Sequence, residues 1–287
     1  MEECKFSRLI AGTMTWGSWG KQLKDSEMID LMHHCISQGI ITFDHADIYG
    51  AYTTEAEFGN ALAKSGIERT HLQLISKCGI QLVDKKRNSE VKHYNYSKDY
   101  IIWSAEESLK KLKTDYLDLF LLHRPSPLMR PEEISEAITR LLDTGKIKSF
   151  GVSNFTESQM KLISEHLSIC TNQIECSISQ STAMTDGTLD YLMSKDITAM
   201  AWSPLGNVFK EQTKRINEIL VTLCEKYDAS KDQLVLAWLL KHPAKIHPVL
   251  GTTTKNRITQ SAEALKINLD LQDWFKMWEA SLGNEVP

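Results

Sequence analysis

The chain is predicted to be an α/β protein, a single-domain (β/α)8 TIM barrel that spans residues 1–287. Short apolar runs rich in β-branched residues recur along the sequence, and a segment with helical periodicity follows each of them. Eight such units fit a closed parallel barrel, which commonly takes about 250 residues as one domain. The competing open, doubly wound sheet would need a G-x-G-x-x-G turn after the first run, and residues 12–17 lack that spacing.

The predicted strands are short, and most of them end in a polar residue or a glycine. Their alternation with helices, rather than any single run, carries the assignment. The strands are expected at residues 8–12, 41–45, 72–78, 117–123, 149–153, 172–176, 197–202 and 248–251.

The predicted helices are amphipathic and lie between these strands. Asp25 or Ser26 and Thr156 are typical of helix N-caps, and Gly39 and Gly145 are typical of helix ends. Two additional helices are expected at residues 232–242, before the last strand, and 274–282, at the C-terminus. The helices between strands are expected at residues 26–38, 98–112, 131–144, 157–167, 187–194, 214–226 and 255–265.

Charge and hydropathy restrict the partners. The 33 basic and 37 acidic residues give a net charge of −4 without a block of lysine and arginine, so nucleic-acid binding is not expected. No apolar run reaches the length of a membrane span, and the first residues contain no apolar signal region. We therefore expect a cytoplasmic protein without a membrane partner, as a monomer or a weak homo-oligomer.

The cysteines and histidines show no metal-site spacing. His33 and His34 lack cysteine or carboxylate ligands nearby, so no metal is expected. The cysteines include no C-x-x-C pair and are expected to be free thiols in a reducing compartment. The six cysteines are Cys4, Cys35, Cys78, Cys170, Cys176 and Cys224.

A long polar loop is predicted at residues 80–100, directly after the third strand. Loops of this length in a compact domain are usually functional or disordered. Because the loop follows a strand, it is expected at the catalytic end of the barrel. We interpret it as a lid on the substrate side, and a passive surface insertion is the alternative.

Four polar residues are predicted to converge at one end of the barrel. Asp44 ends the second strand, Lys77 the third and His123 the fourth, and Tyr49 follows the second strand. The C-terminal ends of barrel strands meet at one mouth, where the catalytic residues of such folds lie. Each residue alone could be packing or a solvated charge. Four of them at three successive strand ends predict a site.

The ordered motifs resemble those of the aldo-keto reductase family over essentially the whole chain. Within the family the sequence is most similar to a bacterial oxidoreductase branch with Asp-His-Ala-Asp-Ile-Tyr-Gly after the second strand, here residues 44–50. The motifs, in family order, are Phe43-Asp44…Tyr49-Gly50, Ser76-Lys77, His123, Gly151-Val152-Ser153-Asn154-Phe155, Asn172-Gln173-Ile174-Glu175 and Trp202-Ser203-Pro204-Leu205-Gly206.

Reduction of a carbonyl by hydride transfer requires the four residue types at the predicted mouth. Negative charge develops on oxygen and a proton donor must neutralise it. A free tyrosine titrates near ~10, and a neighbouring Lys77 ammonium makes the Tyr49 phenol more acidic. Asp44 is expected to pair with Lys77, and His123 to bind the carbonyl oxygen. The resemblance implies this same tetrad, with Tyr49 as the acid.

The resemblance also implies an NADP(H) cofactor. Ser153, Asn154 and Gln173 stand where relatives hold the carboxamide, and Trp202 stands where relatives stack an aromatic ring, often tyrosine, on nicotinamide. A core tryptophan is the alternative reading of Trp202. The first strand and the loop after Trp202 are expected to contact the cofactor through Gly12, Thr13, Met14, Ser203, Pro204, Leu205 and Gly206, and Asp44 is expected to contribute.

The last strand is followed by an element that resembles the adenosine-phosphate site of the family. It comprises Gly251, Thr252, Thr253 and Arg257, and the arginine offers a bidentate cation to a 2′-phosphate. This favours NADPH over NADH. Many relatives carry an acidic residue and asparagine where this chain has Gln260 and Ser261, which puts the adenine contacts in doubt.

The expected substrate is a small-molecule carbonyl, an aldehyde or a ketone. Aromatic and histidine side chains in the loops after the first three strands are either substrate contacts or packing. They are Trp16, Trp19, His45, His93, Tyr94 and Tyr96.

Two other functions remain open on the sequence. The chain could be a cofactor-binding regulatory subunit with vestigial reductase activity, similar to the beta subunits of potassium channels. It could also be a non-redox isomerase or aldolase in which Lys77 forms a Schiff base.

Overall fold

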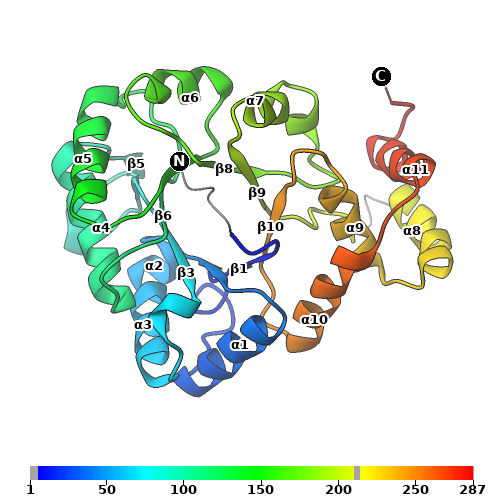
Figure 1. Cartoon of the computed structure of the whole chain (residues 1–287), viewed down its shortest axis with the longest axis horizontal. Coiled ribbons are helices and arrows are strands. Elements are labelled where there is room, and N and C mark those ends of the chain that lie inside the picture. Colours follow the sequence, from blue (N-terminus) through cyan, green and yellow to red (C-terminus); the bar gives the residue numbers. More distant parts are fainter. Residues whose placement is uncertain (1–5, 210–213, 287) are drawn as a thin grey trace.

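The computed structural model describes residues 6–209 and 214–286. Eight parallel strands close into a barrel in the order β1-β10-β9-β8-β7-β6-β3-β2, and helices surround it (Figure 1). This confirms the predicted (β/α)8 barrel. The strands are β1 (Ile10–Gly12), β2 (Thr42–Asp44), β3 (Gln73–Cys78), β6 (Leu119–Leu122), β7 (Phe150–Ser153), β8 (Thr171–Glu175), β9 (Thr198–Trp202) and β10 (His247–Leu250).

The helices follow the predicted alternation, with α9 and α11 as the two additional ones. The two helices of the second unit, α2 and α3, were not predicted, because residues 49–64 begin with a turn rather than with a helical repeat. The helices are α1 (Asp25–Ser37), α2 (Tyr49–Tyr52), α3 (Thr54–Lys64), α4 (Lys98–Leu112), α5 (Pro131–Asp143), α6 (Glu157–Ser164), α7 (Thr188–Ser194), α8 (Lys214–Tyr227), α9 (Lys231–Leu240), α10 (Lys255–Glu263) and α11 (Leu271–Leu282).

Helix capping agrees with the sequence at one position and differs at another. Thr156 is the N-cap of α6, and its hydroxyl accepts a hydrogen bond from the backbone of Gln159, as expected. Helix α1 instead begins at Asp25, and its N-cap is Lys24. The prediction of Asp25 or Ser26 was therefore wrong by one residue, because Glu27 satisfies the Lys24 backbone N–H from the first turn.

The segment after β3 is more ordered than the predicted loop. Strands β4 (Ile80–Gln81) and β5 (His93–Tyr94) pair antiparallel and form a hairpin, with a short 3₁₀ turn at Lys85–Arg87. The hairpin turns back toward the barrel and leads into α4, which begins at Lys98. The predicted loop therefore contains a short hairpin that the sequence did not reveal. Its role as a lid stays a prediction.

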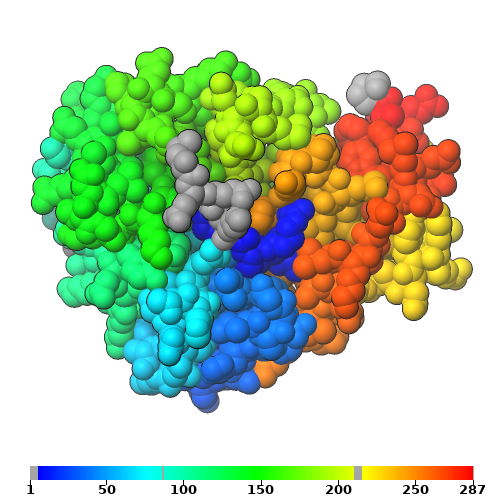
Figure 2. All heavy atoms as spheres, viewed as in Figure 1, coloured from blue at the N-terminus to red at the C-terminus, as the bar shows by residue number. Residues whose placement is uncertain are grey.

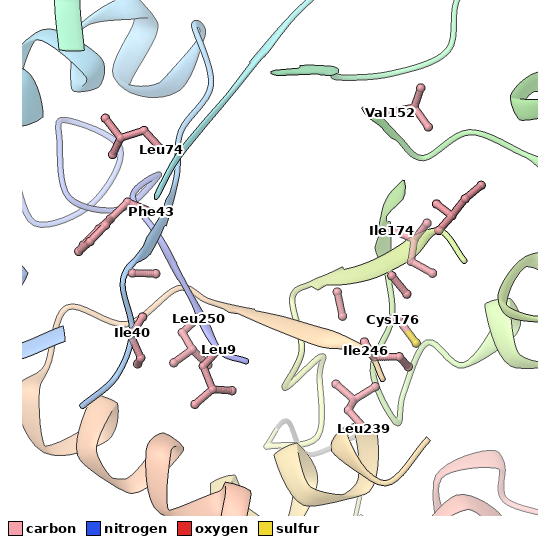
Figure 3. Close-up of a cluster of buried hydrophobic side chains, with 14 of the residues drawn as sticks. Leu9, Ile40, Phe43, Leu74, Val152, Ile174, Cys176, Leu239, Ile246 and Leu250 are labelled. Atoms are coloured by element: carbon pink, nitrogen blue, oxygen red, sulfur yellow. The ribbon is translucent and has the colours of Figure 1, made fainter. Parts of the chain in front are cut away.

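Two apolar layers follow from the alternation of side chains along each strand. Phe43, Leu74 and Ile174 point outward, toward the helices, and belong to the larger core (Figure 3). The opposite faces of the strands fill the inside of the barrel. This inner cluster consists of Ile10, Ile75, Leu119, Leu121, Met200 and Val249.

The N-terminal end of the barrel is covered by the segment before β1. Phe6 packs against the inner cluster, and the Ser7 hydroxyl donates to Thr42 Oγ1 at 2.8 Å. His247 Nδ1 lies 3.0 Å from the Ser7 carbonyl oxygen. Dark blue atoms near the start of the described chain lie close to the centre of the face in Figure 2, surrounded by the other elements. The open end of the barrel is therefore the opposite, C-terminal one.

Candidate active site

The candidate site continues the inward rows of the barrel strands. Side chains two residues apart on a strand share a face, so the residue two positions after an inner apolar one also points inward. Lys77 follows Ile75, His123 follows Leu121, and Trp202 follows Met200 in this way. The strands thus place polar side chains directly above the apolar interior, at the mouth formed by their C-terminal ends.

Lys77 is the centre of the site. Its side chain is fully buried, and its ammonium donates to Asp44 Oδ2 at 2.8 Å, to the His45 carbonyl at 2.8 Å and to the Tyr49 hydroxyl at 3.0 Å. These bonds use all three N–H groups of the ammonium. The structure therefore brings Asp44, Tyr49 and Lys77 together as the sequence predicted.

Tyr49 is presented by an unusual turn. It begins α2, and the next three residues, Gly50, Ala51 and Tyr52, have positive φ angles of 61°, 51° and 74°. A Cβ at Gly50 would lie 2.4 Å from Thr54 Oγ1, so only glycine fits there. Left-handed conformations at the two non-glycine residues are uncommon and cluster at functional sites. The turn aims the phenol back at Lys77.

Burial and charge act in opposite directions on the pKa values of Lys77 and Tyr49. Burial lowers the pKa of Lys77, but the charge of Asp44, the electrostatic interaction with Tyr49 and the hydrogen bonds to both leave that pKa above its ordinary value. Burial raises the pKa of Tyr49, and Asp44 adds to this, while Lys77 lowers it in the expected direction without reversing the sum. At neutral pH the phenol therefore carries its proton and the lysine its charge.

His123 lies beside the phenol. The two rings are 6.1 Å apart in an edge-on arrangement. Burial lowers the pKa of His123 well below its usual range, and the charges of Lys77, Arg124 and Lys92 lower it further, so the imidazole is neutral. Its buried Nδ1 has no hydrogen-bond partner among the described residues. A neutral imidazole with a free nitrogen can donate or accept one hydrogen bond to a ligand.

Asp44 has a second partner from across the barrel. The side-chain amide of Gln173, on β8, donates to Asp44 Oδ1 at 2.9 Å. Gln173 was predicted as a carboxamide contact, and its bond to the tetrad carboxylate was not foreseen. Its side-chain oxygen has no partner in the described part of the chain and can still accept from a ligand.

A second hydrogen-bonded chain orients Trp202. The indole Nε1 donates to Asn154 Oδ1 at 2.9 Å, Asn154 Nδ2 donates to Ser153 Oγ at 2.7 Å, and Ser153 donates to the Gln173 carbonyl at 2.8 Å. Asn154 has a positive φ of 60°, a left-handed conformation that is uncommon in residues other than glycine. Trp202 is half-buried, so one part of its ring stays accessible. These are the residues expected to hold nicotinamide, and they fit a flat ring with a carboxamide.

The other predicted cofactor contacts border the same mouth. Thr13, directly after β1, is buried, and its hydroxyl donates to the Asp44 carbonyl at 2.9 Å, so it supports the backbone of the tetrad. Gly12 ends β1 beside Asp44, and Met14 is exposed. After Trp202 the chain turns at Ser203-Pro204-Leu205-Gly206, where a Cβ at Gly206 would lie 2.1 Å from Ser179 Oγ.

The predicted phosphate element lies at the start of α10. Arg257 forms an ion pair with Asp232 of α9 at 3.2 Å, and both side chains are partly exposed. Gly251, Thr252 and Thr253 form the turn between β10 and α10, and Thr15 Oγ1 donates to the Gly251 carbonyl at 3.0 Å. The arginine is therefore near the predicted element but has a carboxylate partner that the sequence did not reveal.

The comparisons with known proteins agree with this geometry. The family model described as "Aldo/keto reductase family" matches residues 8–281. The chain belongs to the aldo/keto reductase family. It is 43% identical to the uncharacterized oxidoreductase YcsN of Bacillus subtilis, over 100% of this chain and 98% of that one. It is 40% identical to a 6-dehydroglucose reductase of Agrobacterium fabrum, over 88% of this chain and 86% of that one.

Solved structures show the same architecture. The thermostable aldo-keto reductase Tm1743, crystallised with the inhibitor epalrestat, matches with a TM-score of 0.82 and 27% identity. The match covers 95% of this chain and 94% of the other. The fold and the family of this reductase are therefore established along nearly its whole length.

Three of the substrate-facing candidates are packing residues in this reductase. Trp16 is 1% exposed and packs edge-on against Phe43. His45 is buried, with Nδ1 2.9 Å from Thr13 Oγ1, and Tyr96 is buried beneath Gly79. Because their neighbours in space were unknown, the sequence left this alternative open. The remaining three, Trp19, His93 and Tyr94, are exposed, and the Trp19 ring lies 6.3 Å from that of Tyr49.

Two features of the site were missed by sequence reasoning. Asp47 and Glu55 are buried carboxyls behind the tetrad, and burial raises the pKa of Asp47 to about 7. Arg124, directly after His123, lies with its guanidinium carbon 5.3 Å from the Trp202 ring centroid. Its position after a predicted site histidine at a strand end was the available signal.

Cys35, Cys78, Cys170, Cys176 and Cys224 are free thiols, and Cys4 lies outside the described range. In residues 6–209 and 214–286 no three His, Cys, Asp or Glu side chains gather as a metal site. No helix over those same ranges is long and apolar enough to cross a membrane.

Proposed function

We propose that the chain is an NADP(H)-dependent reductase that converts aldehydes or ketones to alcohols, with Tyr49 as the proton donor. The observation that carries this proposal is the buried contact of the Lys77 ammonium with the Tyr49 hydroxyl at 3.0 Å. A neutral phenol beside a fixed positive charge can release its proton when negative charge develops on a nearby carbonyl oxygen.

The cofactor, when bound, supplies the hydride that attacks the carbonyl carbon. The chain's own residues supply everything else. His123 binds the carbonyl oxygen and orients it toward the phenol. Tyr49 gives its proton to that oxygen, and the resulting phenolate is stabilised by Lys77 until solvent returns a proton. Asp44 keeps Lys77 charged and in place.

The residues at the mouth suit NADP(H). Gln173 and Asn154 retain an acceptor and a donor for a carboxamide, and the half-buried Trp202 ring offers a flat surface for nicotinamide. Arg257 suits a 2′-phosphate once it leaves Asp232. The relative from Agrobacterium fabrum is named for the reduction of 6-dehydroglucose, which is consistent with carbonyl reduction here.

A Schiff-base role for Lys77 is disfavoured by its surroundings. An amine nucleophile must be neutral. Lys77 instead donates three hydrogen bonds, to Asp44, to the His45 carbonyl and to Tyr49, and the negative charge of Asp44 holds it as an ammonium. Trapping of a lysine adduct with borohydride and a carbonyl compound would contradict this.

The test is the oxidation of NADPH, followed by absorbance, with a panel of aldehydes. Tyr49→Phe should lower kcat by ~100-fold or more and change the Kd for NADPH by less than about twofold. Tyr116→Phe is the matched control, since it removes a half-buried phenol that precedes β6, at the end of the strand opposite to the mouth, and it should keep wild-type kcat.

Normal turnover by Tyr49→Phe would exclude it as the acid. Tight NADPH binding by the wild type without oxidation by any carbonyl would instead favour a regulatory, cofactor-binding role.

A further inference from the structure

The charges at the mouth of the barrel do not cancel. Lys77 is neutralised by Asp44, His123 is neutral, and Tyr49 is protonated. Arg124 remains as a positive charge at the end of β6. Within residues 6–209 and 214–286 no carboxylate lies within ion-pair distance of it, whereas Arg69 and Arg257 each have one. The mouth therefore carries an uncompensated cation.

Arg124 is held in place by contacts with two aromatic residues. Its backbone N–H donates to the Tyr96 hydroxyl at 3.1 Å, and that hydroxyl donates in turn to the Arg124 carbonyl. Its guanidinium carbon lies 5.3 Å from the centroid of the Trp202 ring, which the hydrogen bond to Asn154 fixes. The backbone and the cation are thus both positioned, while the donors of the guanidinium keep no carboxylate partner in the described chain.

Arg124 directly follows His123, whose ring lies 6.1 Å from that of Tyr49. Besides burial and Lys77, the charge of Arg124 lowers the pKa of His123, and it acts in the same direction on the pKa of Tyr49. Lys92, an exposed residue of the hairpin, adds a second and weaker charge toward His123. A substrate whose carbonyl lies against Tyr49 and His123 is therefore exposed to the field of these two cations.

We propose that Arg124, assisted by Lys92, binds an anionic group of the substrate, so that this reductase prefers carbonyl compounds that carry a carboxylate. Arg124 offers a planar fork of donors that matches a carboxylate. Trp19, 44% exposed and 6.3 Å from the Tyr49 ring, provides an apolar side for the body of such a substrate. This inference rests on the proposed reductase function and specifies its substrate class.

The test compares aldehydes that differ only in charge. The pairs are 4-formylbenzoate with its methyl ester and succinate semialdehyde with its methyl ester, each measured as kcat/KM with NADPH. The wild type should prefer the anion in at least one pair, and added salt should weaken that preference. Arg124→Gln should reduce the preference by about 10- to 100-fold, as expected for loss of a charged hydrogen bond.

Two further variants separate charge from geometry. Arg124→Lys keeps the charge without the fork and should give an intermediate preference. Lys92→Gln should lower the preference by about two- to fivefold, because an exposed charge contributes less. Arg140→Gln is the control: it removes an exposed arginine of α5, far from the mouth, with the same change in net charge, and it should keep the wild-type preference.

The outcomes distinguish a failure of the proposed anion preference from a failure of the proposed reductase function. Turnover of the esters without a preference for either anion would overturn the inference and leave the reductase function standing. An equal loss on both members of a pair in Arg124→Gln would also overturn it, since the residue would then act on structure rather than on the anion. No NADPH oxidation with any of the four aldehydes would overturn the proposed function itself.

Discussion

Gln173 and Lys77 divide the two oxygens of one carboxylate between them. Asp44 Oδ1 accepts from the Gln173 amide at 2.9 Å, and Asp44 Oδ2 accepts from the Lys77 ammonium at 2.8 Å. The two donors come from β8 and β3, which lie on different parts of the barrel wall. The position of Lys77 beside Tyr49 therefore depends on a bond that crosses the interior.

Gln173→Met should loosen this arrangement while keeping the length of the side chain. It removes a buried hydrogen bond to a charged group, which should cost about 1.5–3 kcal/mol of unfolding free energy, measured by chemical denaturation. Turnover should fall because Asp44 and Lys77 lose their fixed geometry. Gln81→Met, which removes another buried amide but at the hairpin, is the control. Full activity in Gln173→Met would show that Lys77 alone holds Asp44.

Asp47 predicts a pH dependence of stability. Burial first, then the nearby Glu55, raises the pKa of Asp47 to about 7 in the folded chain, from 3.8. A raised pKa means that the folded state binds the proton more tightly than the unfolded state does. The stabilisation of the fold by this proton is therefore complete below pH ~4. It is lost as the pH rises through about 7. Above that pH the buried carboxylate destabilises the fold.

Asp47→Asn should therefore stabilise the chain at pH ~8 by a few kcal/mol, at about 1.4 kcal/mol per pKa unit, and by little at pH ~4. Its amide oxygen can still accept from Tyr100 and Ser104. The measurement is urea unfolding across this pH range. Asp115→Asn, at an exposed turn, should leave the pH profile unchanged. An Asp47→Asn profile parallel to that of the wild type would refute the assignment.

Arg87 should hold the hairpin against the barrel. Its guanidinium carbon lies 3.6 Å from the Tyr52 ring centroid and 5.2 Å from that of Trp103. Arg87→Ala removes both contacts, worth about 0.5–2 kcal/mol in total, and should speed amide hydrogen exchange about 2- to 30-fold in residues 80–96. Exchange in α5 serves as the internal reference. Unchanged exchange in the hairpin would mean that its backbone bonds suffice.

Arg257 and Asp232 should set the cofactor preference together. Arg257→Ala should weaken the binding of NADPH by about tenfold or more and the binding of NADH only little, because only NADPH carries the 2′-phosphate. Asp232→Asn removes the competing carboxylate, which lies 3.2 Å away, and should tighten NADPH by about two- to tenfold. Fluorescence titration measures both. An equal loss of NADPH and NADH in Arg257→Ala would contradict a role in 2′-phosphate recognition.

The barrel and the tetrad were predictable from the sequence for one physical reason. Strand periodicity fixes which residues point inward, and the fold directs all strand ends to one mouth, so Lys77 and His123 had to converge. Contacts across space were not predictable. The burial of Trp16, the Asp232 partner of Arg257 and the bond from Gln173 to Asp44 all join segments that are distant in sequence. Periodicity carries no information about them.

Local structure was predicted where a repeat or a cap was strong and missed where a turn interrupted it. Helix α3 follows the left-handed residues at positions 50–52, which conceal the start of its pattern. The hairpin has strands of only two residues each, too short to give an alternating signal.

The inner cluster of the barrel separates the part of the chain that sets stability from the part that sets specificity. The inner cluster (Ile10, Ile75, Leu119, Leu121, Met200 and Val249) is buried beneath the reacting groups, while Arg124 and Trp19 lie in loops after the strands. Substitutions at the rim can therefore change which carbonyl compound is admitted without repacking the interior on which stability depends. Descendants of this chain could therefore change their substrate specificity while they keep the same barrel.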